Sequence, residues 1–433
     1  MSNEAAPRPH ILILGQGSRE HALSRTLAKS PLHPQVFVAP GNDGIAHDPL
    51  VQGGCVPISA TEHQKLLSFC DTHAIDLVVV GPEAPLCDGI VDVLSAAGVR
   101  VIGPVKAAAQ LESSKLFAKR IMASAGIPTA SWSTLASSLE EATQQLQQCV
   151  YPCVLKADGL AGGKGSFIVR SIADALDVVH KLRVERIFGA AGDVILVEEL
   201  LVGKELSYMG LTDGECFLPF SSSQDFKRLS SDDASPNTGG MGAISPSPEC
   251  SPELEQMIQS DIVAPLLQEM SLKGFPYQGF IYVGLMLTSE GPKVLEFNVR
   301  LGDPETQAVL GREGSGDLLE ALLMMSEGKL SAYQGDLRHQ GHAVCVVSAS
   351  QGYPLSVQKG DEIVGLTELL AADAEVFCAG LKYDADADMW LTDGGRVLSV
   401  VAEADSLDEA VERVYALSSR VFWRGLQRRD DIG

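Results

Sequence analysis

Within residues 293–307, positions 295–301 alternate apolar and polar side chains and lead into a Gly-Asp-Pro turn. Because successive side chains of a β-strand point to opposite faces, this alternation predicts a strand with one apolar and one polar face. The two faces would carry Leu295, Phe297 and Val299 on one side and Glu296, Asn298 and Arg300 on the other. An edge strand with a solvated polar face would show the same pattern, so other segments must decide between a site and a surface.

The polar face of this strand has the chemistry of a metal and phosphate site. A carboxylate beside an amide oxygen suits Mg²⁺, which prefers oxygen ligands and is often completed by substrate phosphates and water. Glu296 and Asn298 are therefore candidate metal ligands. Arg300 could hold a phosphoryl oxygen next to them, since a guanidinium group donates two parallel hydrogen bonds.

The length and charge of the chain narrow the classes of function. Its 433 residues are too many for one hydrophobic core and suggest about three domains. With 33 Lys and Arg against 56 Asp and Glu, the formal net charge is −23, which argues against nucleic acid or an anionic membrane as a partner. The nine scattered cysteines, the lack of a signal peptide and the lack of a membrane-spanning run predict a cytoplasmic protein.

The N-terminal part of the chain predicts a parallel sheet with helices between its strands. Residues 11–14, 36–38 and 76–80 are apolar runs, and each leads into a turn rich in glycine or proline. Loops that follow parallel strands meet at one edge of the sheet, where ligands usually bind. Gly15 and Gly17 lack the third glycine of the dinucleotide fingerprint, so nicotinamide binding is weakly supported. Each loop taken alone is more simply a chain reversal.

The middle of the chain predicts a helix followed by a small lid. A helix over residues 106–125 would carry Lys115 and Lys119 on one face. A polar stretch, residues 131–148, then leads to two strands joined by a glycine loop, with Lys156 on the first strand. Glycines let the backbone approach a polyphosphate, but this order is not that of a P-loop, which continues into a helix. A flexible lid over a nucleotide fits the pattern better.

Two polar segments follow the lid. Residues 194–201 predict a strand with adjacent carboxylates that could read an adenine and a ribose, and Glu205 lies just after it. Residues 223–241 form a polar loop before a helix predicted over 252–269. This loop is long for a simple connection, which predicts that it has a function.

The C-terminal part is predicted to close a cleft rather than to perform chemistry. Its strands at 342–347, 376–378 and 397–401 precede a helix over 406–420, and residues 394–397 hold its few candidate catalytic groups. Ser406 suits the N-cap of that helix.

Taken in order, several of these motifs resemble the ATP-grasp ligases, namely Lys115, Lys156, the loop to Gly165, residues 197–201, Glu205, and the Glu296-Phe-Asn298 segment. More narrowly, further segments resemble the phosphoribosylamine–glycine ligase family, also called glycinamide ribonucleotide synthetases: residues 15–22, 39–42, 80–86, 236–242 and 300–307. The resemblance runs from about His10 to Gly433, and the ordered set is far more specific than any one glycine motif.

The resemblance implies an α/β chain, α+β overall, with an ATP-grasp fold. Residues 8–112 would form an N-terminal Rossmann-like domain, 113–330 an ATP-grasp domain with a lid at 130–200, and 331–433 a C-terminal α+β domain. The implied activity joins glycine to 5-phosphoribosylamine with ATP and Mg²⁺ or Mn²⁺, through glycyl phosphate, in purine synthesis. The partners implied are these small molecules, with no nucleic acid and no membrane, and association with other purine-pathway enzymes stays open. We expect a monomer or a weak homodimer.

The resemblance also implies roles for individual residues. ATP would be held by Lys115, Lys156, Gly162, Gly163, Lys164, Gly165, Glu198, Glu199, Leu200, Leu201 and Glu205, and the metal by Glu296 and Asn298. The reacting groups would face Asp225, Lys227, Asn237, Thr238, Gly239 and Arg300. The other substrates would lie against Gly17, Arg19, Glu20, Asn42, Glu83, Pro85, Asp303, Pro304 and Glu305.

The chain departs from the family pattern at a few positions, which are Gln16, Ser18, Gly162, Phe226, Val299 and Leu301. Phe226 stands where histidine is usual, which puts a proton transfer at that position in doubt. Ser18 restricts the backbone of a loop that should cradle phosphate. His21 is alone on a helical stretch and is expected to be packed rather than catalytic.

Three other classes of function stay open on the sequence. An ATP-grasp enzyme for another acid and amine would use the same nucleotide site with a different acceptor. A nicotinamide oxidoreductase would need an intact dinucleotide fingerprint. A nucleotide-binding regulator without turnover would lack the metal ligands or the residues of the reactive loop.

Overall fold

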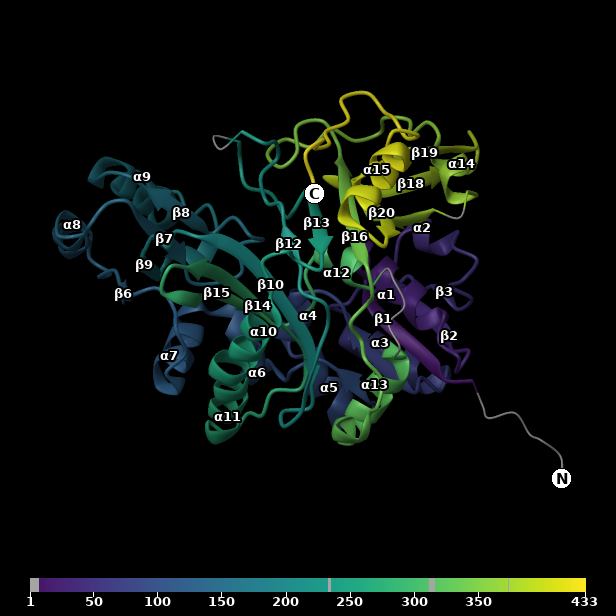
Figure 1. Ribbon diagram of the computed structural model, residues 1–433, viewed down its shortest axis with the longest axis horizontal. Coiled ribbons are helices and arrows are strands. Elements are labelled where there is room, and N and C mark those ends of the chain that lie inside the picture. Colours follow the sequence, from purple (N-terminus) through teal and green to yellow (C-terminus); the bar gives the residue numbers. More distant parts are fainter. Residues whose placement is uncertain (1–7, 233–234, 311–315, 373) are drawn as a thin grey trace.

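The N-terminal part of the chain folds as a parallel sheet with helices between its strands (Figure 1). The computed structural model describes residues 8–232, 235–310, 316–372 and 374–433. The strand order is β3-β2-β1-β4-β5, with β1 (His10–Gly15), β2 (Gln35–Pro40), β3 (Gly54–Cys55), β4 (Leu77–Val80) and β5 (Val101–Ile102). The helices are α1 (Ser18–Ala28), α2 (Asp43–Ala46), α3 (His63–Thr72), α4 (Glu83–Asp88) and α5 (Ile90–Ala96). The predicted Rossmann-like sheet is confirmed.

The central strand of this sheet is apolar on both faces because both faces are covered. Ile11 and Ile13 of β1 belong to one buried cluster, whereas Leu12 and Leu14 belong to another. A parallel strand buried on both sides reads as a continuous apolar run rather than an alternation. The loops at the carboxyl ends of β1, β2 and β4 therefore start from rigid positions.

The helix predicted over 106–125 is two helices, α6 (Lys106–Ser113) and α7 (Lys115–Ala125). Ser114 between them has an extended backbone with φ −138°, and its side chain accepts a hydrogen bond from Phe117 N–H. Serine is a preferred N-cap, so the break starts a new helix at Lys115. The prediction of one continuous helix is wrong, and the break places Lys115 in the first turn of α7.

The lid is a four-stranded antiparallel sheet with two helices (Figure 1). Its strand order is β6-β9-β7-β8, with β6 (Trp132–Thr134), β9 (Ile195–Glu199), β7 (Cys153–Ala157) and β8 (Ser166–Val169). Its helices are α8 (Leu139–Gln147), α9 (Ile172–Arg183) and the short 3₁₀ turn at Gly189–Gly192. These elements share a hydrophobic cluster of their own, which includes Leu155, Val179 and Ile195.

A second antiparallel sheet faces the lid and carries the strand predicted first. Its order is β11-β10-β14-β15, with β11 (Phe217–Pro219), β10 (Lys204–Thr212), β14 (Gly279–Thr288) and β15 (Gly291–Asn298). Beside it lie α10 (Pro252–Ile258), a π-helical turn (Gln259–Val263) and α11 (Ala264–Leu272) in the place of the helix predicted over 252–269. Further along come α12 (Glu305–Val309), α13 (Leu318–Ser326) and a 3₁₀ turn (Leu330–Ala332).

Strand β15 contains a β-bulge that the alternation does not predict. Val294 pairs with Leu285 and Glu296 pairs with Gly284, which leaves Leu295 as the extra residue. A bulge redirects the side chain of the extra residue. Leu295 lines the large cavity, so the prediction that it packs on the apolar face is wrong. The rest of that face is confirmed, because Phe297 and Val299 belong to the buried core, although Phe297 also borders the cavity.

The C-terminal sheet includes two strands from the middle of the chain. Its order is β12-β13-β16-β20-β17, with β12 (Gln224–Asp225), β13 (Gly242–Ser245), β16 (His342–Ala349), β20 (Arg396–Ala404) and β17 (Glu375–Cys378). The remaining elements are the hairpin β18 (Leu381–Asp384) and β19 (Met389–Thr392), and the helices α14 (Leu366–Leu370) and α15 (Leu407–Ser418). The predicted loop over 223–241 thus starts and ends on this sheet. Within the described residues, no helix is long and apolar enough to cross a bilayer.

Candidate active site

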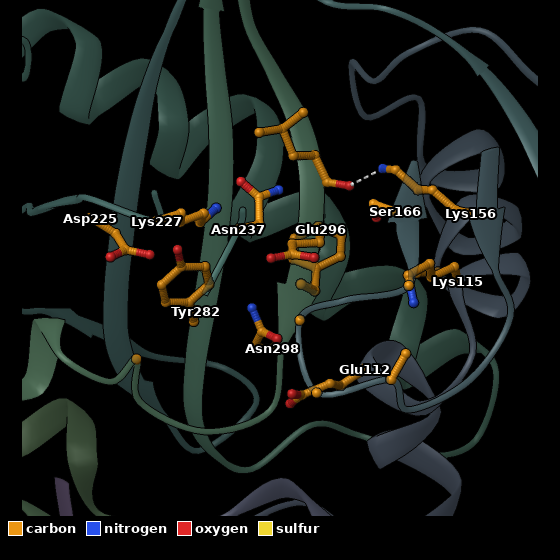
Figure 2. Close-up of a pocket in the computed structure, with 18 of the residues that line it drawn as sticks. Glu112, Lys115, Lys156, Ser166, Asp225, Lys227, Asn237, Tyr282, Glu296 and Asn298 are labelled. Atoms are coloured by element: carbon orange, nitrogen blue, oxygen red, sulfur yellow. Dashed lines mark hydrogen bonds between the residues drawn. The ribbon is translucent and has the colours of Figure 1, made fainter. Parts of the chain in front are cut away.

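A cavity of about 570 Å³ lies between the lid, the second antiparallel sheet and the edges of the N- and C-terminal parts. Figure 2 shows its lining, with Lys115, Lys156 and Ser166 on the right, Asp225, Lys227 and Tyr282 on the left, and Glu296 and Asn298 between them. Most of the predicted site residues line it: Arg19, Glu83, Lys115, Lys156, Gly162, Gly163, Gly165, Glu198, Glu199, Leu200, Leu201, Glu205, Asp225, Lys227, Asn237, Thr238, Gly239, Glu296, Asn298, Arg300, Asp303 and Glu305. The predicted residues outside its lining are Gly17, Glu20, Asn42, Pro85, Lys164 and Pro304.

Glu296 and Asn298 present the oxygen donors expected for a divalent metal. They lie on one face at the end of β15, beside each other in the cavity (Figure 2). Burial alone would raise the pKa of Glu296, but the surrounding cations, chiefly Lys227 and Lys156, lower it. Glu296 is therefore ionised and able to bind a cation. One carboxylate and one amide suit Mg²⁺, whose remaining ligands are commonly phosphates and water.

Arg300 is held between two carboxylates at the base of the cavity. Its guanidinium lies 3.0 Å from Glu112 and 3.4 Å from Glu83. It also donates to Asn298 Oδ1 at 3.2 Å. Burial raises the pKa of Glu112 to about 7, although the Arg300 charge acts in the opposite direction. Sequence reasoning missed Glu112, because nothing in the α6 sequence marks one polar residue as buried.

Three lysines converge on the lid side of the cavity. Glu198 Oε2 accepts from Lys156 at 2.9 Å and from Lys119 at 3.1 Å, while its Oε1 is buried without a hydrogen-bond partner among the described residues. Lys156 also donates to the carbonyl of Leu295 at 3.2 Å (Figure 2). Burial lowers the pKa of Lys119 to about 8 and also lowers that of Lys115. The predicted shared face of Lys115 and Lys119 is confirmed by their common position in the cavity wall.

The glycine loop of the lid lines the cavity, with bare backbone at Gly162, Gly163 and Gly165. Gly162 and Gly163 have φ of +55° and +75°, which favour glycine, and a Cβ on Gly162 would meet no atom within 4 Å. Lys164 lies between the glycines but points elsewhere, since its Nζ donates to the carbonyl of Pro354 at 3.3 Å. The structure therefore separates Lys164 from the cavity-lining lysines.

An ion pair and a buried carboxylate face the metal candidates from the opposite wall. Lys227 lies 2.8 Å from Glu205, and this carboxylate raises the pKa of Lys227 against the effect of burial. Burial and the nearby Glu305 carboxylate raise the pKa of Asp225 well above its ordinary value. Tyr282 lies beside Asp225 and was not predicted from the sequence (Figure 2).

The N-terminal loops contribute side chains to the cavity unequally. Arg19 lines it, and Glu20 supports Arg19 from behind with an ion pair of 2.7 Å. Glu20 also accepts from Gly17 N–H at 2.7 Å. Asn42 caps α2 and donates to the carbonyl of Cys378 at 2.9 Å, so its amide holds the loop in place.

His21 is packed, as predicted. Its Nε2 lies 3.0 Å from Asp48, and its Nδ1 accepts from Cys378 N–H at 2.9 Å. Burial lowers its pKa, although Asp48 acts in the opposite direction. His21 thus joins α1 to the C-terminal sheet and does not reach the cavity.

The comparisons with known proteins agree with this architecture. Three family descriptions match the chain in order: the N domain of phosphoribosylglycinamide synthetase over residues 9–112, its ATP-grasp (A) domain over 113–306 and its C domain over 343–433. The biotin carboxylase domain of 2-oxoglutarate carboxylase from Hydrogenobacter thermophilus, solved with MgADP, has a TM-score of 0.71 at 16% identity and covers 97% of this chain and 91% of its own, which shows the ATP-grasp fold alone.

Relatives of higher identity carry a single name. The phosphoribosylamine–glycine ligase of Salmonella typhi is 45% identical over 98% of this chain and 97% of its own, and that of Caldanaerobacter subterraneus is 42% identical over 98% and 99%. The crystal structure of phosphoribosylamine–glycine ligase from Thermotoga maritima has a TM-score of 0.81 at 32% identity, covering 98% of this chain and 100% of that one. The chain belongs to the phosphoribosylglycinamide synthetase family.

Proposed function

We propose that this protein joins glycine to 5-phosphoribosylamine at the expense of ATP, giving glycinamide ribonucleotide, ADP and phosphate in purine synthesis. One observation carries the proposal: a single cavity combines lysines under a glycine-rich lid, an ionised carboxylate beside an amide, and an arginine. The names of the relatives that match nearly the whole chain support it.

The chemistry explains why these groups are needed. A carboxylate is a poor acyl donor, so a glycine oxygen would first attack the γ-phosphorus of ATP, and the bond to the ADP oxygen would break. The ribosylamine nitrogen would then attack the carbonyl carbon of glycyl phosphate, and phosphate would leave. Both steps depend on positioning and on stabilising negative charge, which lysine, arginine and backbone N–H groups provide.

We assign the lid side of the cavity to ATP. Lys115 and Lys156 would hold its phosphates, residues 198–201 would read the adenine, and Glu205 would bind the ribose. The loop that contains Gly162, Gly163 and Gly165 would close over the phosphates. Lys164 would move with this loop. This assignment is supported by the convergence of these groups around one cavity wall.

We assign the end of β15 to the metal and the reacting phosphoryl group. Glu296 and Asn298 would hold Mg²⁺ or Mn²⁺, which supplies positive charge to the phosphates when bound. Arg300 would face the acyl phosphate from below. Glycine would lie near the loop residues on the opposite wall, which are Asp225, Lys227, Asn237, Thr238 and Gly239.

We assign the N-terminal edge to phosphoribosylamine. Arg19 and Glu83 would contact it directly, together with Asp303 and Glu305, because all four line the cavity. The predicted residues outside the lining would shape this end instead, and they are Gly17, Glu20, Asn42, Pro85 and Pro304.

We further propose that the protein works in the cytoplasm as a monomer or weak homodimer. The nine cysteines, which are all free thiols in the structure, are consistent with a reducing compartment. Light scattering over a range of protein concentrations would test the oligomeric state, since a stable mass above a dimer would contradict it.

The direct test of the activity is ADP release from MgATP with glycine and freshly made phosphoribosylamine, each omitted in turn. Release that needs both substrates, and that Glu296→Ala abolishes, is the expected result. ATP binding without release in the complete mixture would mean that the acid or the amine is a different one. Unchanged release in Glu296→Ala would contradict the metal assignment.

A further inference from the structure

Two side chains of the C-terminal region hold the loop that carries the candidate residues for binding the substrate glycine. Arg396, at the start of β20, donates from Nη1 to the carbonyl of Gly239 at 2.8 Å and to that of Asp303 at 2.7 Å. Its Nη2 lies 2.9 Å from the Asp303 carboxylate. The hydroxyl of Tyr353 accepts from Gly239 N–H at 3.0 Å. Both peptide groups of Gly239 are therefore fixed by the C-terminal region.

Close packing fixes the same loop from the other sides. Gly240 has φ of +110°, and a Cβ there would lie 2.3 Å from Pro304 Cδ and 2.7 Å from Asp225 Oδ1. A Cβ on Gly395 would lie 2.6 Å from the ring of Tyr353. Neither contact leaves room for a side chain. The loop at Gly240, the turn at Pro304 and the ring of Tyr353 therefore form one packed unit.

The charge of Arg396 is compensated within this unit. Burial alone would lower its pKa, but the Asp303 carboxylate raises it, so the arginine remains a cation paired with an anion. Its Nη1 is already committed to two carbonyl groups. These contacts suit a group that orders the backbone rather than one that supplies a free positive charge.

We propose that Arg396 is a positioning residue for the glycine end of the site, assisted by Tyr353, and that neither acts on ATP. Together they set the Gly239–Gly240 backbone against the 302–304 turn. The glycine end of the site is therefore complete only with the C-terminal sheet in place. The inference rests on the proposed ligation of glycine for its kinetic test. Its structural part, the ordering of the loop, does not depend on which acid reacts.

Conservative variants separate positioning from general folding. In Arg396→Lys a single ammonium cannot span two carbonyls and a carboxylate as the planar guanidinium does. Tyr353→Phe keeps the ring that packs on Gly395 and removes only the acceptor of Gly239 N–H. Arg424→Lys is the matched control, because Arg424 is 81% exposed and pairs with Asp361 away from the cavity.

The experiment measures the KM for glycine, the Kd of a non-hydrolysable ATP analogue by calorimetry, and hydrogen exchange of the 235–241 segment. In Arg396→Lys and Tyr353→Phe we expect the glycine KM to rise by about tenfold or more, with the analogue Kd within about twofold of wild type. The 235–241 amides should exchange faster than in wild type in both variants. Their exchange rates should be unchanged in Arg424→Lys.

Two results would overturn the inference. An unchanged glycine KM with unchanged exchange in both variants would mean that these contacts do not order the loop. A parallel loss of affinity for the ATP analogue would mean a general effect on the fold. If Arg396→Lys does not fold, Tyr353→Phe alone decides. If wild type does not ligate glycine, the proposed function fails, and the exchange of the loop still decides this inference.

Discussion

The guanidinium of Arg300 lies 3.0 Å from the buried carboxylate of Glu112, so another element orients the candidate phosphate-binding arginine. The second oxygen of Glu112 accepts from Val299 N–H at 2.7 Å. One carboxylate on α6 therefore fixes both the side chain of Arg300 and the backbone at the end of β15. The two elements are far apart in the sequence and meet only in the folded chain.

Replacing this carboxylate should impair turnover more than nucleotide binding. Glu112→Gln keeps the shape but removes the charge-assisted bond to Arg300, worth roughly 1.5–3 kcal/mol. We expect kcat to fall by about ten- to a hundredfold while the Kd of an ATP analogue changes little. Glu140→Gln on the exposed surface of α8 is the matched control. Equal kcat values for Glu112→Gln and wild type would contradict this orientation role.

The same residue should give the protein a pH-dependent stability. The folded pKa of Glu112 is about 7, above its ordinary value of 4.5, so folding favours its protonated form. Its contribution to stability is full below the unfolded pKa and is lost as pH rises through about 7. From about pH 5 to 8 wild type should lose up to ~3 kcal/mol of unfolding free energy relative to Glu112→Gln. Urea denaturation at both pH values checks this, and a constant difference would refute it.

Lys119 should matter for ATP although it is almost fully buried. Lys119→Met leaves the Glu198 carboxylate with Lys156 as its one remaining cationic partner among the described residues, so Lys156 is drawn toward Glu198. We expect the Kd of an ATP analogue to rise by about tenfold with the glycine KM unchanged. Lys181→Met on the exposed face of α9 provides the control. If the Kd of the ATP analogue and the glycine KM rise equally in Lys119→Met, the role of Lys119 is not confined to nucleotide binding.

The two lysines of the lid should differ in their effects. Lys156 lines the cavity, whereas Lys164 donates to the carbonyl of Pro354 outside it. Lys156→Ala should therefore raise the Kd of the ATP analogue by at least about tenfold, and Lys164→Ala should raise it by less than about threefold. Calorimetric titration of both variants decides the point. A larger loss in Lys164→Ala would mean that the loop turns its lysine inward when ATP binds.

Sequence patterns predicted the parts of the site that depend on local geometry. Alternation on β15 placed Glu296 and Asn298 on the cavity face, because both lie after the bulge, where the strand keeps its ordinary two-residue period. Helical spacing likewise placed Lys115 and Lys119 on one face of α7.

The features that the sequence did not predict depend on contacts between distant segments. Leu295 reaches the cavity because β15 carries a bulge in its pairing with β14. Glu112 becomes important only because Arg300 packs against it. The sequence marked residues 394–397 as candidates, but the contact of Arg396 with Gly239 depends on the position of β20. The family resemblance implies that Lys164 binds ATP, whereas in the structure its Nζ donates to the carbonyl of Pro354. Each of these requires the tertiary arrangement.

The most direct test of the central claim uses glycine labelled with ¹⁸O in both carboxylate oxygens. If glycine is activated as glycyl phosphate, its oxygen bridges to phosphorus and leaves with the phosphate when the amine attacks. We predict one ¹⁸O in each inorganic phosphate released and one in each glycinamide ribonucleotide, measured together by mass spectrometry. Product formed with unlabelled phosphate would contradict activation through an acyl phosphate, and ADP formed without the amide product would contradict the ligation itself.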